Sequence, residues 1–165
     1  MRKSISLLRM RGNYFLGPSF VVGILAAIAI PAYHDYTQRV KVTEGLNMAG
    51  AVKASVAEFY AVNGKLPRDL RELKYESVPR GQYVMFVAVN RGTVVIRYSR
   101  SAGPQLARQQ VTIRPTVSSG GDITWSCGYA PDQGEDPASG AASPHATTLP
   151  PKYLPRACRG DFGQR

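Results

Sequence analysis

The chain has 165 residues, a formal net charge of +10 and two cysteines. This length allows one ordinary domain, or a smaller domain with an anchor and a tail, and excludes an assembly of several domains. A domain left over beside an anchor would bury only a small core, so a covalent cross-link would help to stabilise it.

The basic excess is unevenly distributed. Residues 1–33 carry four basic and no acidic side chains, and residues 81–126 carry five basic and one acidic. The first cluster is typical of a cytoplasmic flank, because basic residues beside an apolar segment resist translocation. In the second, Arg97, Arg108 and Arg114 form a candidate face for a polyanion such as DNA, although scattered solvated arginines are the simpler explanation.

A basic, leader-like segment, residues 1–13, precedes an apolar run, residues 14–33. Residues 12–33 include 22 positions without a charged side chain, and as a helix they would extend about 33 Å, enough to cross a bilayer core of about 30 Å. A Gly-Pro-Ser break at 17–19 leaves 20–33 as the strongly apolar part, which is too short to span a membrane alone.

Three interpretations of this run stay open from the residues alone. A membrane anchor fits the length and the basic flank. A cleaved secretory signal fits the basic start and the apolar middle, and Ala27-Ile28-Ala29 resembles a small-x-small cleavage site, but the helical pattern does not stop there. A buried core helix fits the length of the strongly apolar part, although such a helix seldom follows a basic, acid-free leader.

Residues 34–63 are predicted to form an amphipathic half-helix that continues the apolar one. Apolar side chains recur there every three or four positions, at Val42, Leu46, Ala49, Val52, Val56, Phe59 and Tyr60. Asn63-Gly64 tolerates a left-handed helix cap, so the helix is expected to end near residue 63. Pro31 removes one backbone hydrogen bond and is expected to kink the helix locally.

Strands are predicted where the period of the sequence changes to two. After a polar connecting loop, residues 64–81, the strand patterns are 82–89, 93–99, 108–115 and 123–127, with a short turn at Asn90-Arg91-Gly92. The first pattern is apolar on both faces and is typical of a central strand, whereas the second and third alternate between a buried and a wet face. Residues 82–127 therefore predict a four-stranded antiparallel sheet that packs on the helix, in an α+β fold.

Both cysteines, Cys127 and Cys158, lie late in the chain. In a cytosolic protein they would be two buried thiols, whereas behind an export or anchoring segment they are expected to form one disulfide. Residues 128–165 follow the last strand, and their small and polar composition is typical of a free tail unless something holds it. A disulfide between the two cysteines would close a loop of 31 residues and attach the tail to the last strand. In the chain-entropy model this bond would stabilise the folded state by about 3.7 kcal/mol.

Two parts of the sequence resemble type IV pilins, specifically the major pilins with a C-terminal disulfide loop. Residues 23–67, GILAAIAIPAYHDYTQRVKVTEGLNMAGAVKASVAEFYAVNGKLP, are similar to the pilin helix, including Pro31 and Glu44-Gly45. Residues 123–128 (ITWSCG) and 152–159 (KYLPRACR) are similar to the segments that carry the pilin cysteines. The resemblance implies a long N-terminal helix on an antiparallel sheet, followed by a C-terminal disulfide loop.

The resemblance also implies a function. It is that of a structural subunit of a type IV pilus, which supports cell adhesion, surface motility or DNA uptake. Such a subunit is held in the bacterial inner membrane and then packs with copies of itself and other pilus subunits into a cell-surface filament, or fimbrium. Gly23 and Pro31 would then serve helix assembly and kinking. An apolar half-helix that leaves lipid must bury the same surface against neighbouring helices.

The resemblance does not extend to the processing signal. Where the family carries the leader glycine, the methylated phenylalanine and a glutamate, this sequence has Arg9, Met10 and Tyr14. The prepilin peptidase site is therefore not in register, and cleavage, N-methylation and the contact of the glutamate with a neighbouring subunit are not carried over. A divergent copy, a damaged copy and a start out of frame with the true leader all stay open.

Two other functions stay open as well. A pseudopilin of a type II secretion system would share the helix but usually lacks this cysteine pair, and a secreted binding domain would discard roughly the first 32 residues as a signal peptide. Enzyme chemistry, a cofactor and a metal are not expected. His34 and His145 lie 111 positions apart without ligand partners, and Glu72 and Glu76 lie in a charged, solvated stretch.

Overall fold

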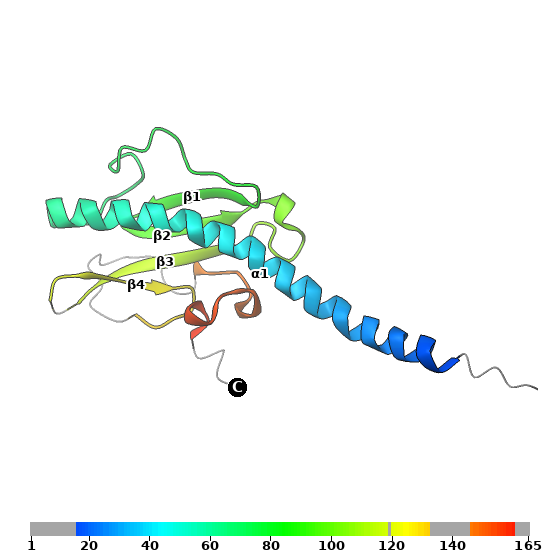
Figure 1. Cartoon of the computed structure of the whole chain (residues 1–165). Helices are drawn as coiled ribbons and strands as arrows, with labels where there is room; N and C mark the ends of the chain where they lie inside the picture. Colours follow the sequence, from blue (N-terminus) through cyan, green and yellow to red (C-terminus); the bar gives the residue numbers. More distant parts are fainter. Residues whose placement is uncertain (1–15, 119, 133–145, 161–165) are drawn as a thin grey trace, which may run out of the picture. The chain divides into compact units, whose positions relative to one another are not determined.

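The computed structural model describes residues 16–118, 120–132 and 146–160, with side chains from Tyr33 onward. A long helix is followed by a four-stranded sheet and by short 3-10 helices, η1 (Arg100–Ala102), η3 (Pro151–Tyr153) and η4 (Arg156–Cys158) (Figure 1). The chain divides into two compact units, residues 1–34 and 35–165. The second unit, called the head below, contains the helix-on-sheet fold.

Helix α1 comprises Leu16–Asn63. In the head its buried residues recur every three or four positions, so that one side of the helix faces the sheet. They are Val42, Ala49, Val52 and Val56, with Leu46, Phe59 and Tyr60 half-buried beside them. The predicted apolar stripe is confirmed. The predicted end is confirmed too, since Gly64 has a φ of 65° and donates its N–H to the carbonyl of Tyr60 at 2.8 Å.

The sheet is an antiparallel meander, as predicted. Its strands are β1 (Val84–Asn90), β2 (Thr93–Tyr98), β3 (Gln110–Val117) and β4 (Ile123–Cys127). Strands that follow one another in the chain are hydrogen-bonded neighbours, in the order β1-β2-β3-β4. Each predicted strand therefore exists, with the predicted bounds for β4 and bounds that differ by at most two residues for the others.

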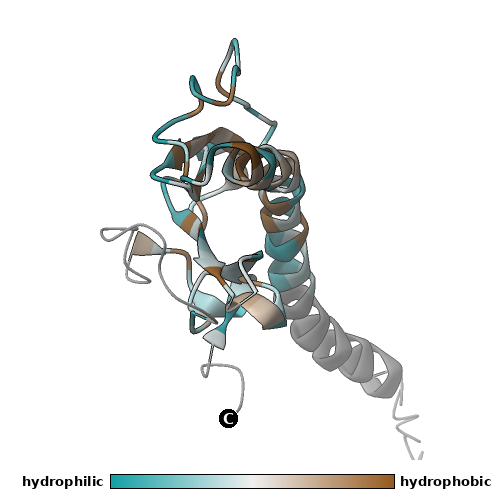
Figure 2. Ribbon diagram, turned by 90° about the vertical axis from the view of Figure 1, so that its left-hand side faces the viewer, coloured by the Kyte–Doolittle hydropathy of each residue, from teal (hydrophilic) through white to brown (hydrophobic). Residues whose placement is uncertain are grey.

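The core lies between helix α1 and one face of the sheet, which form two layers (Figures 1 and 2). The strands contribute fully or almost fully buried side chains that alternate along the chain, as the period of two predicts. They include Val87, Val94, Ile96, Tyr98, Val111 and Ile113. The buried face predicted for the second strand pattern is therefore confirmed.

A two-residue turn joins β1 to β2. Arg91 and Gly92 have φ values of 47° and 81°, which is the left-handed pair that matches the twist of a hairpin. Their N–H groups donate to the carbonyls of Arg68 and Pro67 at 3.0 and 2.8 Å. The connecting loop is thus fixed to the tip of this hairpin.

The prediction of a central position for the first strand is wrong. Strand β1 lies at the edge of the sheet, and a bulge between Val84 and Phe86 shifts its alternation. As a result Val84 and Val87 are both buried, while Met85 between them is 50% exposed. The unbroken apolar run predicted a strand that is buried on both faces. Here the bulge explains part of that run, because it places side chains of an odd spacing on the same buried face.

The prediction of a wet outer face on β3 is also wrong. Thr112, Arg114 and Thr116 lie on the side opposite the helix, yet they are 0%, 3% and 1% exposed. Residues 128–132 and 146–149, on either side of the undescribed stretch 133–145, hydrogen-bond to this side of the strand. The sequence alone does not reveal this cover, because a periodic pattern shows which side chains share a face and not what packs on it.

Candidate functional site

Cys127 and Cys158 form a disulfide, as predicted. Their Cα atoms are 4.6 Å apart, and the bond joins the end of β4 to the end of η4. Beside it, Gly128 has a φ of 59°, and a side chain there would lie 2.5 Å from the carbonyl oxygen of Cys158. The glycine after the first cysteine therefore allows the two segments to lie side by side.

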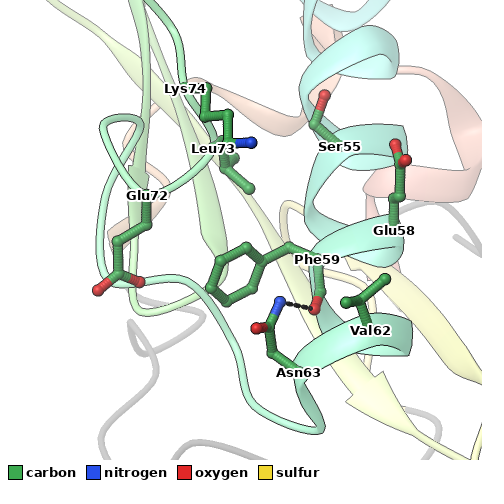
Figure 3. A pocket seen from close by; sticks show the side chains of 8 residues that line it. All are labelled: Ser55, Glu58, Phe59, Val62, Asn63, Glu72, Leu73 and Lys74. Atoms are coloured by element: carbon green, nitrogen blue, oxygen red, sulfur yellow. Dashed lines mark hydrogen bonds between the residues drawn. The ribbon is translucent and has the colours of Figure 1, made fainter.

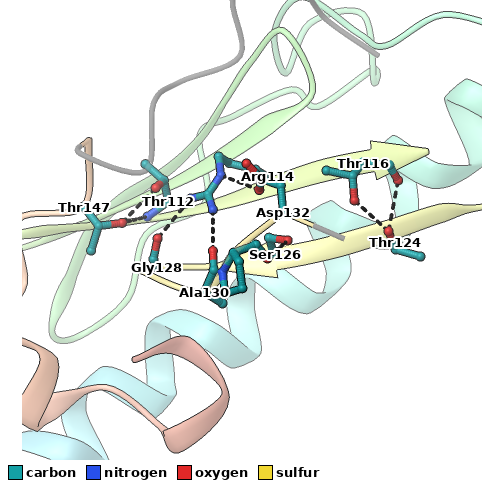
Figure 4. A network of polar contacts seen from close by, with 10 residues as sticks. Thr112, Arg114, Thr116, Thr124, Ser126, Gly128, Ala130, Asp132 and Thr147 are labelled. Carbon is teal, nitrogen blue, oxygen red and sulfur yellow. Dashed lines mark hydrogen bonds and ion pairs between the residues drawn. The ribbon is translucent and has the colours of Figure 1, made fainter. Parts of the chain in front are cut away.

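The disulfide-bounded segment leaves the sheet through residues 128–132, called the outgoing limb below, and comes back through residues 146–149, called the returning limb. Arg114 of β3 holds the outgoing limb (Figure 4). Its guanidinium donates to Asp132 Oδ1 at 2.9 Å, to the carbonyl of Gly128 at 2.9 Å and to the carbonyl of Ala130 at 2.8 Å. The Arg114 side chain is buried, so the ion pair and the two carbonyls replace the water that it loses.

Thr112 and Gln110 of β3 hold the returning limb. Thr112 donates its N–H to Thr147 Oγ1 at 3.1 Å, and the two hydroxyl oxygens are 2.8 Å apart. Gln110 donates its N–H to Thr148 Oγ1 at 3.0 Å and its side-chain amide to the carbonyl of Ala146 at 2.6 Å. Both limbs are therefore fixed to β3 by polar contacts in addition to the disulfide.

The three arginines proposed for a polyanion face do not form one surface. Arg114 is 3% exposed and paired with Asp132, so its inclusion is wrong. Arg97 is half-buried and donates to Gln110 Oε1 at 2.9 Å, while Arg108 is exposed in a left-handed conformation with φ 61°. A period of two placed Arg114 on the outer face correctly, but the limbs that cover it carry no periodic signal.

The side of helix α1 that faces away from the sheet is exposed and largely uncharged. Tyr36 and Val40 are 66% and 51% exposed, and Val62 is 79% exposed. The remaining exposed positions on this side are mostly small or polar, namely Thr43, Asn47, Gly50, Ala51, Ala54 and Ala61, with Arg39 and Glu58 as the charged ones. Small side chains permit close helix packing, so this side is a candidate assembly face.

A groove of about 440 Å³ lies between the last turns of helix α1 and the connecting loop (Figure 3). The helix contributes Ser55, Glu58, Phe59, Val62 and Asn63, and the loop contributes Glu72, Leu73 and Lys74. Glu72 Oε2 accepts the N–H of Arg68 at 2.8 Å, and Ser55 Oγ lies 3.2 Å from the hydroxyl of Tyr75. Ser55 Oγ hydrogen-bonds to the carbonyl of Ala51 and to the hydroxyl of Tyr75 rather than to a base, so the described lining gives no nucleophile–base pair.

Two side chains at the helix–sheet interface have shifted acidities. Burial, and then the charge of Glu44, raise the pKa of the Tyr98 phenol far above its ordinary value. Burial lowers the pKa of the Lys53 ammonium, which lies 5.1 Å from the centre of the Trp125 ring. Both shifts follow from packing between α1 and the sheet. Among the described residues, no cluster of His, Cys, Asp or Glu is suited to hold a metal ion.

The membrane and leader predictions concern residues that are largely undescribed. Residues 1–13 lie outside the described part, and Gly23 and Pro31 lie in α1 where side chains are not described, so their roles stay predictions. Over the residues that the structure does describe, no helix combines the length and the apolar character that a membrane crossing requires.

Comparison with known proteins gives a consistent result. A family model described as pilin (bacterial filament) matches residues 39–159. Type IV major pilin protein PilE1 of Neisseria gonorrhoeae is 33% identical over 144 residues, which cover 84% of this chain and 79% of the relative. Fimbrial protein EcpC of Eikenella corrodens is 35% identical over 143 residues, covering 84% and 82%. Type IV major fimbrial protein FimA of Dichelobacter nodosus is 50% identical over 38 residues, covering 23% and 24%.

Proposed function

Because this chain belongs to the pilin family of bacterial filament proteins, we propose that it is a structural subunit of a type IV pilus at the cell surface. Its relatives are type IV major pilins and fimbrial proteins, and its fold is a helix on a four-stranded sheet with a C-terminal disulfide. The pseudopilin and the secreted binding domain are not favoured.

The exposed side of helix α1 carries this proposal. A soluble domain covers or charges such a surface, whereas a filament subunit buries it against copies of itself. Tyr36, Val40 and Val62 are each more than half exposed, and the small residues between them leave room for a neighbouring helix. We expect this face to be a contact between subunits in the filament.

The state of the subunit before assembly and the role of the assembled filament are part of the same proposal. Before assembly the apolar run 14–33 would hold the chain in the inner membrane, and Gly23 and Pro31 would serve helix packing and kinking. The filament would support adhesion, surface motility or DNA uptake, without enzymatic activity. Processing by a prepilin peptidase is not part of the proposal, because Arg9 and Met10 stand where the family has its cleavage site.

Complementation of a piliated bacterium that lacks its own major pilin tests this function. The unchanged chain is expected to yield filaments that shear from the cells and are visible by electron microscopy. Val40→Glu places a charge on the candidate assembly face and is expected to abolish filaments. Val78→Glu is a matched control, because Val78 is 44% exposed but lies in the connecting loop.

Two results would contradict the proposal. One is the absence of filaments from cells that accumulate the unchanged, disulfide-bonded chain, and the other is normal filaments from the Val40→Glu variant. The intact mass of the cell-associated protein adds a separate check. A mass that corresponds to a chain starting near Tyr33 would indicate a secreted domain with a cleaved signal.

A further inference from the structure

The arginines of the sheet and its loops occur without acidic neighbours in the sequence. Residues 77–121 contain six arginines and no aspartate or glutamate, whereas residues 64–76 mix four basic with three acidic side chains. Two of these six arginines are at opposite ends of β2, because Arg91 lies in the β1–β2 turn and Arg97 lies next to the last residue of the strand.

Three of the arginines belong to the end of the sheet where β2 passes into β3. Arg97 lies beside Tyr98 at the end of β2, Arg100 begins η1 in the connection, and Arg108 closes that connection. The N–H of Arg108 donates to the carbonyl of Tyr98 at 3.1 Å. The two ends of the connection are therefore adjacent, so the backbones of Arg97, Arg100 and Arg108 all lie near this end of the sheet.

Arg80 lies near the same end, in the loop that runs along the free edge of β1. The residue before it, Pro79, accepts the N–H of Val87 at 2.9 Å, and the residue after it, Gly81, donates to the carbonyl of Val84 at 3.0 Å. Val84, the first residue of β1, pairs with Tyr98, the last residue of the neighbouring strand β2. We call this group, Arg80, Arg97, Arg100 and Arg108, the basic end.

The charges of the basic end are available to a ligand. Arg80, Arg100 and Arg108 are exposed, and among the described residues none of them forms an ion pair, in contrast to Arg114 with Asp132. Among the described residues, Glu44 brings a carboxylate near this end. Both of its oxygens accept the N–H of Tyr83 at 3.3 Å, so the carboxylate is held by the backbone.

We propose that the basic end, made of Arg80, Arg97, Arg100 and Arg108, binds the phosphates of double-stranded DNA without reading its sequence. This inference rests on the proposed function and assigns a surface to the DNA contact of the filament. Guanidinium groups suit phosphate oxygens, because their planar fork donates two hydrogen bonds at once.

The surroundings of the basic end favour duplex over single-stranded DNA. Proteins that bind single strands provide exposed aromatic rings on which bases stack. Among the described residues, the large exposed aromatic side chains are Tyr33 and Tyr36, and both belong to helix α1. Recognition at the basic end therefore depends on backbone phosphates, which a duplex presents in regular array.

The opposite end of the sheet provides a matched control. Arg68 and Arg91 are exposed there, and their backbones are joined by a hydrogen bond of 3.0 Å. However, Asp69 and Glu72 are fixed beside them, because their carboxylates accept the N–H groups of Arg71 and Arg68 at 2.8 Å each. Local acidic charge is expected to weaken phosphate binding at this end.

Fluorescence anisotropy of a labelled duplex of about 20 base pairs, with the full chain in a neutral detergent, tests the proposal. With three phosphate contacts, the association constant should fall about 40-fold between 50 and 200 mM salt. Arg100→Gln/Arg108→Gln should weaken binding at low salt and reduce that fall to about 3-fold. Arg68→Gln/Arg91→Gln removes the same net charge and should leave both quantities close to those of the unchanged chain.

The two double variants are matched in backbone strain as well as in charge. Each contains one left-handed arginine, with φ 61° at Arg108 and 47° at Arg91, so a general effect on folding would appear in both. Formation of the Cys127–Cys158 bond, measured by non-reducing mass analysis, confirms that each variant has folded.

Equal loss of binding in both double variants would overturn the proposal, because it would indicate attraction to the net charge alone. Absence of salt-dependent binding in the unchanged chain would overturn it too. So would equal competition by phosphatidylglycerol vesicles, which would identify an anionic surface in general as the ligand. None of these results affects filament assembly, which is measured separately, so failure of the DNA proposal and failure of the pilus proposal are distinguishable.

Discussion

Replacing Gly45 by alanine tests the close contact between helix α1 and the sheet. A methyl group at this position would lie 2.7 Å from Ile96 Cγ2 and 2.7 Å from the hydroxyl oxygen of Tyr98. Both side chains are fully buried, so neither has free space into which to move. The same hydroxyl donates to the carbonyl of Val42 at 2.9 Å, and the added methyl would disturb that hydrogen bond.

The expected magnitude follows from three opposing contributions. Overpacking a buried contact destabilises by about 1–3 kcal/mol, and disturbing the hydrogen bond of Tyr98 adds about 1 kcal/mol. Alanine favours the helix over glycine by about 1 kcal/mol. We therefore expect Gly45→Ala to lower the free energy of unfolding by about 1–3 kcal/mol.

Gly50 supplies the control on the same helix. It is exposed, and a methyl group there would have no atom within 4 Å, so Gly50→Ala is expected to stabilise the chain by about 1 kcal/mol. Urea unfolding followed by the fluorescence of Trp125, the one tryptophan of the chain, measures both variants. If Gly45→Ala proved as stable as Gly50→Ala, the close packing of α1 on β2 would be refuted.

Three further changes test the disulfide, the buried phenol and the polar contacts of β3. Replacing Cys127 and Cys158 together by serine should lower the free energy of unfolding by about 3.7 kcal/mol, and a loss below about 1 kcal/mol by urea unfolding would show that the polar contacts suffice. Stability should fall as the pH rises above about 10, because the unfolded phenol of Tyr98 then loses its proton while the folded one, whose pKa is raised by burial and by Glu44, retains it. Tyr98→Phe should flatten this alkaline fall in pH-dependent unfolding, and an unchanged slope would assign it to other groups. Arg114→Met should destabilise by about 1–3 kcal/mol and accelerate proteolysis between residues 128 and 146, so an unchanged cleavage rate would contradict its role in holding that limb.

Periodicity was sufficient to predict the elements of the fold from the sequence. The alternation of Val94, Ile96 and Tyr98 is confirmed because every second side chain of a strand must point to the same face. The end of α1 was predictable for a similar reason, since Gly64 adopts the positive φ that glycine tolerates without strain. Both features depend on local backbone geometry.

The contacts of the disulfide-bounded segment were not predictable in the same way. Arg114, Thr112 and Thr116 alternate with apolar residues, which is equally typical of a wet face and of a face covered by polar contacts. Their partners, such as Asp132 and Thr147, lie in stretches of small and polar residues with no period. Arg114 is separated from Asp132 by 18 positions, and only the three-dimensional path of the chain brings them together.

The position of each carboxylate, rather than the count of charges, decides where this protein can attract a polyanion. The Asp69 carboxylate accepts the backbone N–H groups of Arg71 and Glu72, and the Glu72 carboxylate accepts that of Arg68. Both negative charges are therefore fixed beside the β1–β2 turn, whichever conformation the neighbouring arginine side chains adopt. No carboxylate of residues 77–121 performs such a role, because that stretch contains none. Two ends of one sheet that carry similar numbers of arginines therefore differ in local potential, and removing two charges from either end leaves the same net charge. A difference in DNA affinity between the two double variants can then arise only from the place of the charges.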